Sequence, residues 1–123
     1  MAKQKETLVF LHDYNAAARM DDAFIVLHAG KNWEDMTEES RADIKYLLNF
    51  FENLAIGLNH NIYDRKMVRD AFGLDLWLFY QLACPYIRAV REEDKQKHPN
   101  APGSYQRAYS EFEKLSERIS AAR

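Results

Sequence analysis

The chain has 123 residues, of which 47% are hydrophobic and 29% charged, and its 17 basic and 19 acidic side chains leave a net charge of −2. This length and composition predict one folded domain and exclude a disordered chain. The charge balance provides no basic surface for nucleic acid. The single cysteine, Cys84, cannot form an internal disulfide and favours a reducing, cytoplasmic compartment.

The N-terminal region predicts helix. Its apolar run, residues 8–11, is too short for a signal peptide, and no later apolar stretch reaches the about 20 residues of a membrane span. The stretch from Glu6 to Ala29 predicts one long or two short helices, with Gly30 as the stop. The expected core positions are Phe10, Tyr14, Ala17, Phe24 and Leu27. Residues 30–40 are interpreted as a connecting loop.

The strongest helical signal follows this loop. Apolar residues recur at the i, i+3, i+4, i+7 spacing and span an arc of roughly 120°, typical of a helix packed on a core. They are Ile44, Leu47, Leu48, Phe51, Leu54, Ala55 and Leu58. Thr37 is the expected N-cap, and residues 59–61 are the expected end.

Two further helices are predicted after this one. Asp64 is the expected cap of a short helix that Gly73 closes. A third helix is expected from Asp75 to Glu93. Pro85 removes a hydrogen bond inside it and predicts a kink or a break near residues 81–84.

The last part of the chain predicts a loop and a final helix. Residues 92–104 are charged and then rich in turn formers, which indicates an exposed loop. Ser104 is the expected cap of a helix whose apolar stripe is Tyr105, Ala108, Phe112, Leu115 and Ile119. The sequence as a whole, residues 1–123, therefore predicts an all-α single domain, a compact bundle of four to five helices.

Glu52 is the most conspicuous polar residue, because it lies beside the apolar stripe. An ionised carboxylate at such a margin requires a partner, and arginine suits bidentate pairing. The expected partners are Arg69, Arg88 or Arg91, which would make Glu52 an interhelical strut. The alternative is a polar pocket around Glu52, Arg69 and Arg88 that binds a small ligand or performs minor enzymatic chemistry.

No other motif indicates catalysis, a cofactor or a metal. The four histidines stand alone, without the spacing of a helical zinc site or of a di-metal carboxylate site. Cys84 lies in an apolar segment and is expected to behave as a small hydrophobe. Glycine-rich phosphate loops and nucleophile elbows are absent. We therefore expect no catalytic, cofactor-binding or metal-binding residues.

Aromatic residues make up 13% of the chain, more than one small core needs. Tyrosine, tryptophan and arginine are the usual anchors of protein interfaces. The expected interface residues are Trp33, Trp77, Tyr80, Tyr105 and Tyr109. They predict self-association, such as a homodimer, or a surface for another protein.

Three segments carry a resemblance to a known family: "LLNFFENLAIGLNHNIYDRKMVRDAFG", "PYIRAVREE" and "YSEFEKLSER". In this order they resemble domain-of-unknown-function family 4760, a group of small helical bacterial and phage domains, most strongly over about residues 44–118. The family brings no established activity. The resemblance implies that Glu52, Arg69, Asp70 and Arg88 form an internal polar network or a shared site.

These observations predict a non-enzymatic, cytoplasmic helical module of bacterial or phage origin. It would bind itself or another protein, as an inhibitor or accessory factor of a host protein. Neither a membrane nor nucleic acid is expected as a partner.

Overall fold

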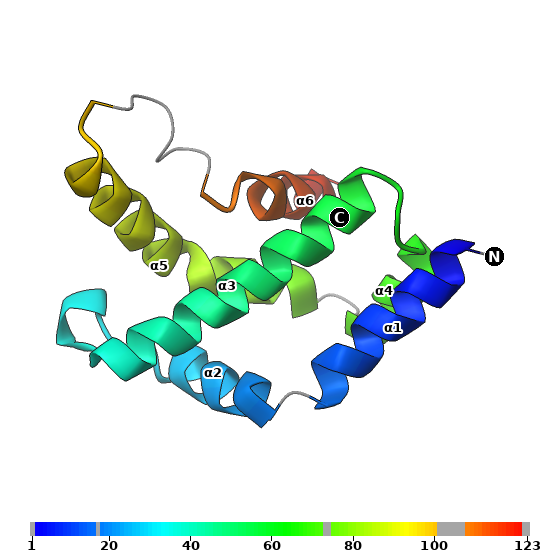
Figure 1. Cartoon of the computed structure of the whole chain (residues 1–123), viewed down its shortest axis with the longest axis horizontal. Helices are drawn as coiled ribbons and strands as arrows, with labels where there is room; N and C mark the ends of the chain where they lie inside the picture. The colour runs from blue at the N-terminus through cyan, green and yellow to red at the C-terminus, as the bar shows by residue number, and fades with distance from the viewer. Residues whose placement is uncertain (1, 17, 73–74, 101–107, 122–123) are drawn as a thin grey trace.

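The computed structural model describes residues 2–16, 18–72, 75–100 and 108–121, without the side chains of residues 2, 11–19, 72, 75 and 120–121. All regular structure in these ranges is helical, which confirms the all-α class (Figure 1). The count is six α-helices in the described residues, more than the four to five expected. They are α1 (Ala2–Ala16), α2 (Ala18–Ala29), α3 (Glu38–Asn59), α4 (Arg65–Phe72), α5 (Asp75–Lys97) and α6 (Ser110–Ala121), with a 3-10 turn, η1 (Trp33–Asp35), before α3.

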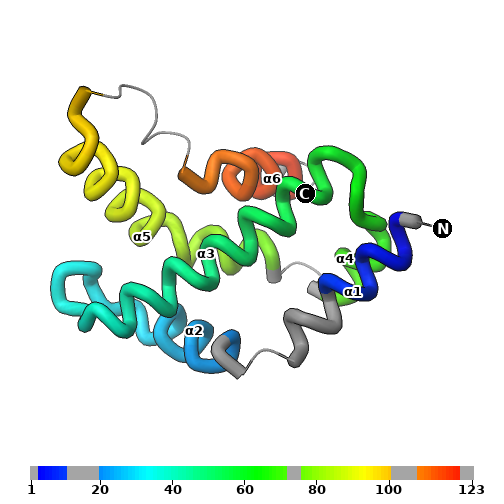
Figure 2. The backbone as a smooth tube through the Cα atoms, in the orientation of Figure 1, coloured from blue at the N-terminus to red at the C-terminus, as the bar shows by residue number. Residues whose placement is uncertain are grey.

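Helix α3 is the central element, and the other helices lie around it (Figures 1 and 2). It begins as predicted, because the side chain of Thr37 accepts a hydrogen bond from the backbone N–H of Ser40 at 3.1 Å. All seven residues of the predicted apolar stripe are buried. The 3.6-residue period was therefore sufficient to predict which face of α3 meets the core.

Phe51 joins three helices to α3 through ring contacts. Its ring stacks on Phe112 of α6 at 5.1 Å, lies 5.3 Å from Phe79 of α5 and meets the edge of Phe24 of α2 at 6.2 Å. Such ring pairs contribute beyond the area they bury. The aromatic residues of the sequence are thus largely used in the interior.

Helices α1 and α4 form a side layer, drawn on the right of Figure 1. Thr7 of α1 is fully buried, and its hydroxyl accepts the backbone N–H of Asp64 at 2.7 Å. Asp64 in turn caps α4 as predicted, since its Oδ1 accepts the N–H of Met67 at 3.0 Å. Phe10 stacks on Phe50 at 4.7 Å and completes the contact with α3.

The N-terminal region forms two helices, as one of the two expected arrangements. Leu27 is buried, and Phe10 and Phe24 pack against the core. Tyr14 and Ala17 lie outside the described side chains. Gly30, with a φ of 67°, follows the end of α2 as predicted, because this left-handed conformation suits glycine.

The end of α3 is a Schellman motif. The N–H of Ile62 donates to the carbonyl of Gly57 at 2.7 Å, and the N–H of Asn61 donates to that of Leu58 at 3.2 Å. Asn61 adopts the left-handed conformation that the motif requires, with a φ of 62°. The chain thereby reverses, and the ring of Tyr63 folds back onto Gly57.

Helix α5 agrees with its prediction at Pro85 and differs from it at the C-terminal end. It runs through Pro85 without a break, and Figure 2 shows its first turns at an angle to the rest, which is the kink that the proline predicts. It also continues to Lys97, four residues beyond Glu93, so the run expected as an exposed loop begins as helix. The residues of that run are strong helix formers with favourable i, i+4 pairs.

Helix α6 begins at Ser110, later than expected. Ser104, the predicted cap, and Tyr105 lie outside the described residues, as does Gly73, the predicted end of α4. Phe112 and Leu115 are buried, and Ala108 and Ile119 are partly buried against the core, as the stripe predicts. None of the helices in the described ranges combines the length and the apolar character needed to cross a lipid bilayer.

Candidate functional site

Glu52 is a cap for a helix other than its own. Its carboxylate accepts the backbone N–H of Phe112, in the first turn of α6, at 2.8 Å, and it also interacts with the backbone of Glu111. The first N–H groups of a helix have no partner within that helix. Glu52 supplies one from α3, and so fixes the end of α6 against the centre of the fold.

The electrostatics of Glu52 differ from those of a salt bridge. Burial raises its pKa above the ordinary value, and the charge of Glu111 adds to this effect. The hydrogen bonds from the α6 backbone and the charge of Arg91 lower the pKa, but they do not outweigh burial. Glu52 therefore differs from the arginine-paired carboxylate that the sequence predicted.

The structure does not assemble the predicted polar network. Arg69, Asp70 and Arg88 are exposed, and Glu52 makes no hydrogen bond or ion pair with any of them within the described part of the chain. The three side chains proposed for a ligand pocket therefore do not meet around Glu52. Glu52 has a structural role in this geometry, with backbone N–H groups in place of the expected arginine.

Arg91 of α5 also contacts this junction. Its Nε donates to the carbonyl of Ala108 at 3.0 Å, and its Nη1 lies 3.4 Å from the carboxylate of Glu113. Its Nη2 is buried and has no hydrogen-bond partner among the described residues. Arg91 thus ties α5 to the residues before and within the first turn of α6.

Two of the predicted interface tyrosines belong to this same junction. Tyr109 is 8% exposed and has a φ of 62°, and burial, followed by the charges of Asp94 and Glu52, raises its pKa to about 12. The hydroxyl of Tyr80 donates to Glu113 at 3.2 Å, and burial together with Cys84 raises its pKa well above the usual range. Tyr109 is therefore an internal residue and no exposed anchor, while Tyr80 is half-buried.

Trp33 is also internal, although it lies in the region expected to be a loop. It is 7% exposed, and its indole N–H donates to Glu93 of α5 at 2.8 Å. Arg41 of α3 donates through Nε to the backbone carbonyl of Trp33 at 2.9 Å, and its guanidinium lies 5.1 Å from the ring centroid. Trp33 thus joins η1, the beginning of α3 and the end of α5.

Glu93 holds this second polar cluster together. One of its oxygens lies 4.0 Å from Arg41 and the other 3.4 Å from Lys45. Burial raises the pKa of Glu93, but the hydrogen bond from Trp33 and the charge of Lys45 outweigh it, so the pKa falls below its ordinary value. This carboxylate was not predicted as a site residue, because its only local signal was a helical spacing of four residues from Lys97.

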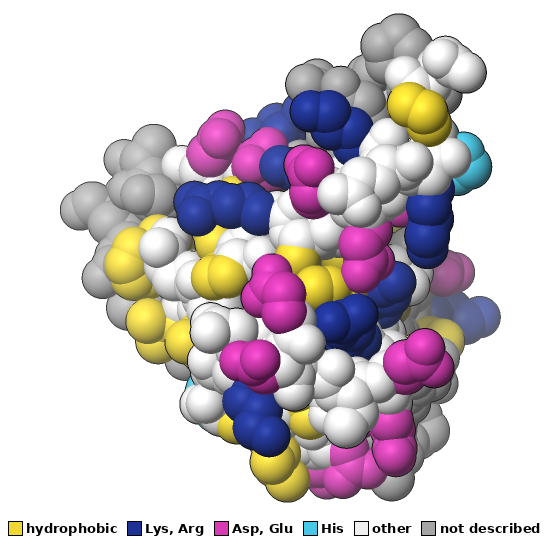
Figure 3. Space-filling view, turned by 90° about the vertical axis from the view of Figure 1, so that its left-hand side faces the viewer, with side chains coloured by type: hydrophobic (Ala, Val, Ile, Leu, Met, Phe, Trp, Pro, Cys, Tyr) yellow, Lys and Arg dark blue, Asp and Glu magenta, His cyan; other side chains and the backbone are white. Residues whose placement is uncertain are grey.

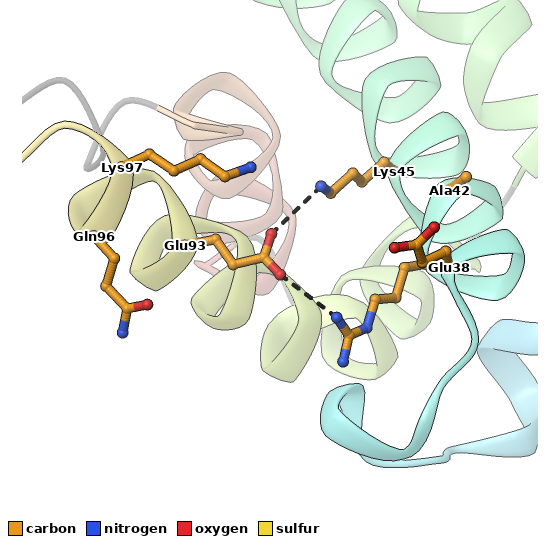
Figure 4. Close-up of a pocket in the computed structure, with 7 residues that line it drawn as sticks. Glu38, Ala42, Lys45, Glu93, Gln96 and Lys97 are labelled. Carbon is orange, nitrogen blue, oxygen red and sulfur yellow. Dashed lines mark hydrogen bonds and ion pairs between the residues drawn. The ribbon is translucent and has the colours of Figure 1, made fainter.

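A groove of about 480 Å³ opens beside this cluster, between the beginning of α3 and the end of α5 (Figure 4). Its lining residues are Glu38, Arg41, Ala42, Lys45, Glu93, Gln96 and Lys97. Figure 3 shows acidic and basic side chains interspersed on the side of the molecule where these two helix ends lie. Neither Glu52 nor any other residue of the predicted network lines the groove.

The outer face of α5 carries an apolar stripe, which we call the α5 stripe: Leu78, Leu82 and Pro85. These residues fall within an arc of roughly 60° on a helical wheel. Leu78 is 49% exposed and Leu82 39% exposed, and Pro85 is exposed as well. The half-buried Trp77 and the exposed Arg88 lie along one side of the stripe.

The possible metal ligands of the chain are its histidine, cysteine, aspartate and glutamate side chains. In residues 2–16, 18–72, 75–100 and 108–121, no group of three or more histidine, cysteine, aspartate or glutamate side chains is placed to hold a metal ion. Cys84 is half-buried, on the same face of α5 as Tyr80, one turn further on.

The fold and the site define an all-helical domain whose helix ends are capped and joined to neighbouring helices by hydrogen bonds and ion pairs. The chain belongs to the family described as domain of unknown function DUF4760, whose sequence model matches residues 1–119. The match extends beyond residues 44–118 and includes the N-terminal helices, which the resemblance in the sequence left out. No curated protein and no solved structure matches the chain.

Proposed function

We propose that this protein is a non-enzymatic interaction module that binds another protein through the α5 stripe. The observation that supports it most directly is the set of exposed apolar residues on one helix face, Leu78, Leu82 and Pro85. Their i, i+4, i+7 spacing is the spacing by which one helix packs against another. Apolar side chains in such a row are typical of the centre of an interface.

The residues beside the stripe support the same proposal. Tryptophan and arginine are the residues that most often anchor protein interfaces, and Trp77 and Arg88 flank the stripe on one side. Two residues predicted for separate reasons, one as an interface aromatic and one as part of a polar network, thus belong to one surface. The partner that fits is a helix with an apolar face and an acidic residue opposite Arg88.

The proposal includes a cytoplasmic location and a bacterial or phage origin. In that setting the protein would act as an inhibitor or accessory factor of a host protein. The free cysteine supports a reducing compartment. A second copy of the chain is the alternative occupant of the stripe, which would give a homodimer.

The test uses a stripe variant and a matched control. The double variant Leu78→Glu/Leu82→Glu places two charges on the stripe, whereas Leu8→Glu places a charge on α1, where Leu8 is 58% exposed. The tagged proteins are recovered from native lysate and their partners identified by mass spectrometry. We expect the wild-type protein and Leu8→Glu to retain the same partner and the stripe variant to lose it, with unchanged circular dichroism.

Sedimentation of the purified protein separates the two occupants. A dimer that the stripe variant dissociates would identify a second copy as the occupant. A strictly monomeric protein that recovers no partner, or a partner retained by the stripe variant, would contradict the proposal.

A further inference from the structure

The groove between α3 and α5 has more basic than acidic side chains. Its lining includes Arg41, Lys45 and Lys97 on the one hand and Glu38 and Glu93 on the other, so one positive charge is left over. The groove lies at the far end of α5 from the α5 stripe. Binding in the groove is therefore independent of the proposed protein interface.

The two carboxylates of the groove do not neutralise all of this positive charge. Glu93 is occupied by Trp33, Arg41 and Lys45, through contacts of 2.8, 4.0 and 3.4 Å. The charge of Lys97 contributes to lowering the pKa of Glu93, but its ammonium group makes no hydrogen bond to a described residue. Lys45 Nζ lies 3.4 Å from the Glu93 carboxylate and 5.8 Å from the centroid of the Trp33 ring. Each ammonium group has three donors, so both retain donors for a further acceptor.

The two lysines reach into the groove from its two walls. Figure 4 shows Lys97 and Lys45 extending toward one another from opposite walls of the groove, with Glu93 lying below them. Two cations that converge in this way repel each other, and an anion between them converts the repulsion into two attractive contacts. The electrostatic potential between Lys45 and Lys97 therefore favours a negatively charged group there.

From this arrangement we infer that the groove binds a carboxylate group between Lys45 and Lys97. A monoanion brings the lining to three positive and three negative charges, whereas a phosphate dianion would leave the groove negative. The volume of about 480 Å³ lies in the range of small-ligand sites and exceeds what a lone carboxylate fills. The stems of the lysines and Ala42 can contact the body of the ligand. Free carboxylic acids and acidic peptide side chains share this chemistry.

The test is an NMR titration of the full-length, ¹⁵N-labelled chain at constant ionic strength. The probes are acetate, the blocked peptide acetyl-Ala-Glu-Ala-amide, its glutamine counterpart and inorganic phosphate. We expect the glutamate peptide to produce saturable shifts at the amides of Ala42, Lys45 and Lys97, and the glutamine peptide to produce none. Acetate shifting the same amides would identify free acids as ligands, whereas shifts by the glutamate peptide alone would identify a polypeptide ligand.

Variants of single lysines give the matched control. Lys97→Gln removes one wall of the site from the exposed last turn of α5, and Lys66→Gln makes the same charge change on the exposed surface of α4. Loss of one such contact should weaken binding about fivefold, and Lys66→Gln should leave it unchanged. The inference is overturned if both variants respond equally, if the glutamine peptide binds as well as the glutamate peptide, or if phosphate binds more tightly than either carboxylate.

Discussion

The carboxylate of Glu52 accepts the backbone N–H of Phe112 at 2.8 Å, although the two residues lie 60 positions apart. This bond caps α6 from the middle of α3, beside the stacked rings of Phe51 and Phe112. A polar and an apolar contact thus fix the same turn of α6. The last helix is held in place by a side chain that the sequence separates from it by two other helices.

Removing the cap should destabilise the protein far more than neutralising it. Glu52→Ala leaves the N–H of Phe112 without a partner, and we expect a loss of about 1–3 kcal/mol in the free energy of unfolding. Glu52→Gln keeps an oxygen acceptor and removes a charge whose burial is unfavourable, so we expect a loss below about 1 kcal/mol. Urea unfolding of both variants measures the difference. Asn53→Ala, at an exposed position of α3, serves as the control.

The raised pKa of Glu52 also predicts how its contribution depends on pH. A carboxyl group whose pKa is higher in the folded than in the unfolded protein stabilises the fold most when it is protonated. Its contribution is present below the ordinary value of 4.5 and is lost as the pH rises through the folded pKa. The wild-type protein should therefore lose stability relative to Glu52→Gln as the pH rises above the ordinary value of 4.5. An opposite slope would show that an arginine holds the pKa low.

Glu93 should show the opposite dependence on pH. Its pKa is lowered in the folded protein, so its contribution is present above 4.5 and is lost as the pH falls through the folded pKa. The wild-type protein should lose stability relative to Glu93→Gln as the pH is lowered below about 4.5. Its contacts with Arg41 and Lys45 are partly exposed, so the effect of the substitution near pH 7 should stay below about 1 kcal/mol.

The fluorescence of Trp33 provides a local measure of the protonation of Glu93. In a Trp77→Phe background Trp33 is the remaining tryptophan, and its indole N–H donates to Glu93. We expect its emission to change over the pH range in which Glu93 is protonated, and this change to be absent in Glu93→Gln. Emission that changes equally in both proteins would assign the transition to another group.

Gly57 should reverse the usual effect of replacing a helical glycine with alanine. In an exposed helix this change gains about 1 kcal/mol. At Gly57, however, a Cβ atom would overlap the ring of Tyr63, which folds back onto α3. We expect Gly57→Ala to lower the free energy of unfolding by about 1–3 kcal/mol. In a Tyr63→Ala background the same substitution should be neutral or stabilising, and a loss of equal size in both backgrounds would show that the ring is not the cause.

The parts of the fold that sequence predicted correctly depend on short-range signals. The apolar stripe of α3 follows from the helical period, and the caps at Thr37 and Asp64 follow from side chains that bond to their own helix three residues on. Gly30 ends α2 for a similarly local reason. Each of these features needs only a few neighbouring residues.

Two of the errors arose where distant segments decide the outcome, and a third had a local cause. Glu52 was interpreted as a strut paired with an arginine, but the structure gives it the backbone N–H of Phe112 as its partner. The position of that helix end depends on the packing of α3, α5 and α6. Trp33 was predicted as an interface residue in a loop, yet it is buried and its indole N–H donates to Glu93 of the distant helix α5. The charged residues 92–97 were interpreted as loop, although their composition favours helix. The last of these could have been predicted from helix propensity alone.

Asn61 provides a final test, because it separates backbone conformation from side-chain bonding at the end of α3. Its φ of 62° lies in the left-handed region, which asparagine tolerates better than other non-glycine residues, and its Oδ1 accepts a hydrogen bond from Lys3 of α1 at 2.7 Å. We expect Asn61→Ala to lower the free energy of unfolding by about 1 kcal/mol and Asn61→Gly to leave it unchanged or raise it. The bond to Lys3 is exposed, so Lys3→Ala should change the free energy by less than about 0.5 kcal/mol. If Asn61→Gly were as destabilising as Asn61→Ala, the side-chain bond would be the main contribution and the Schellman geometry a minor one.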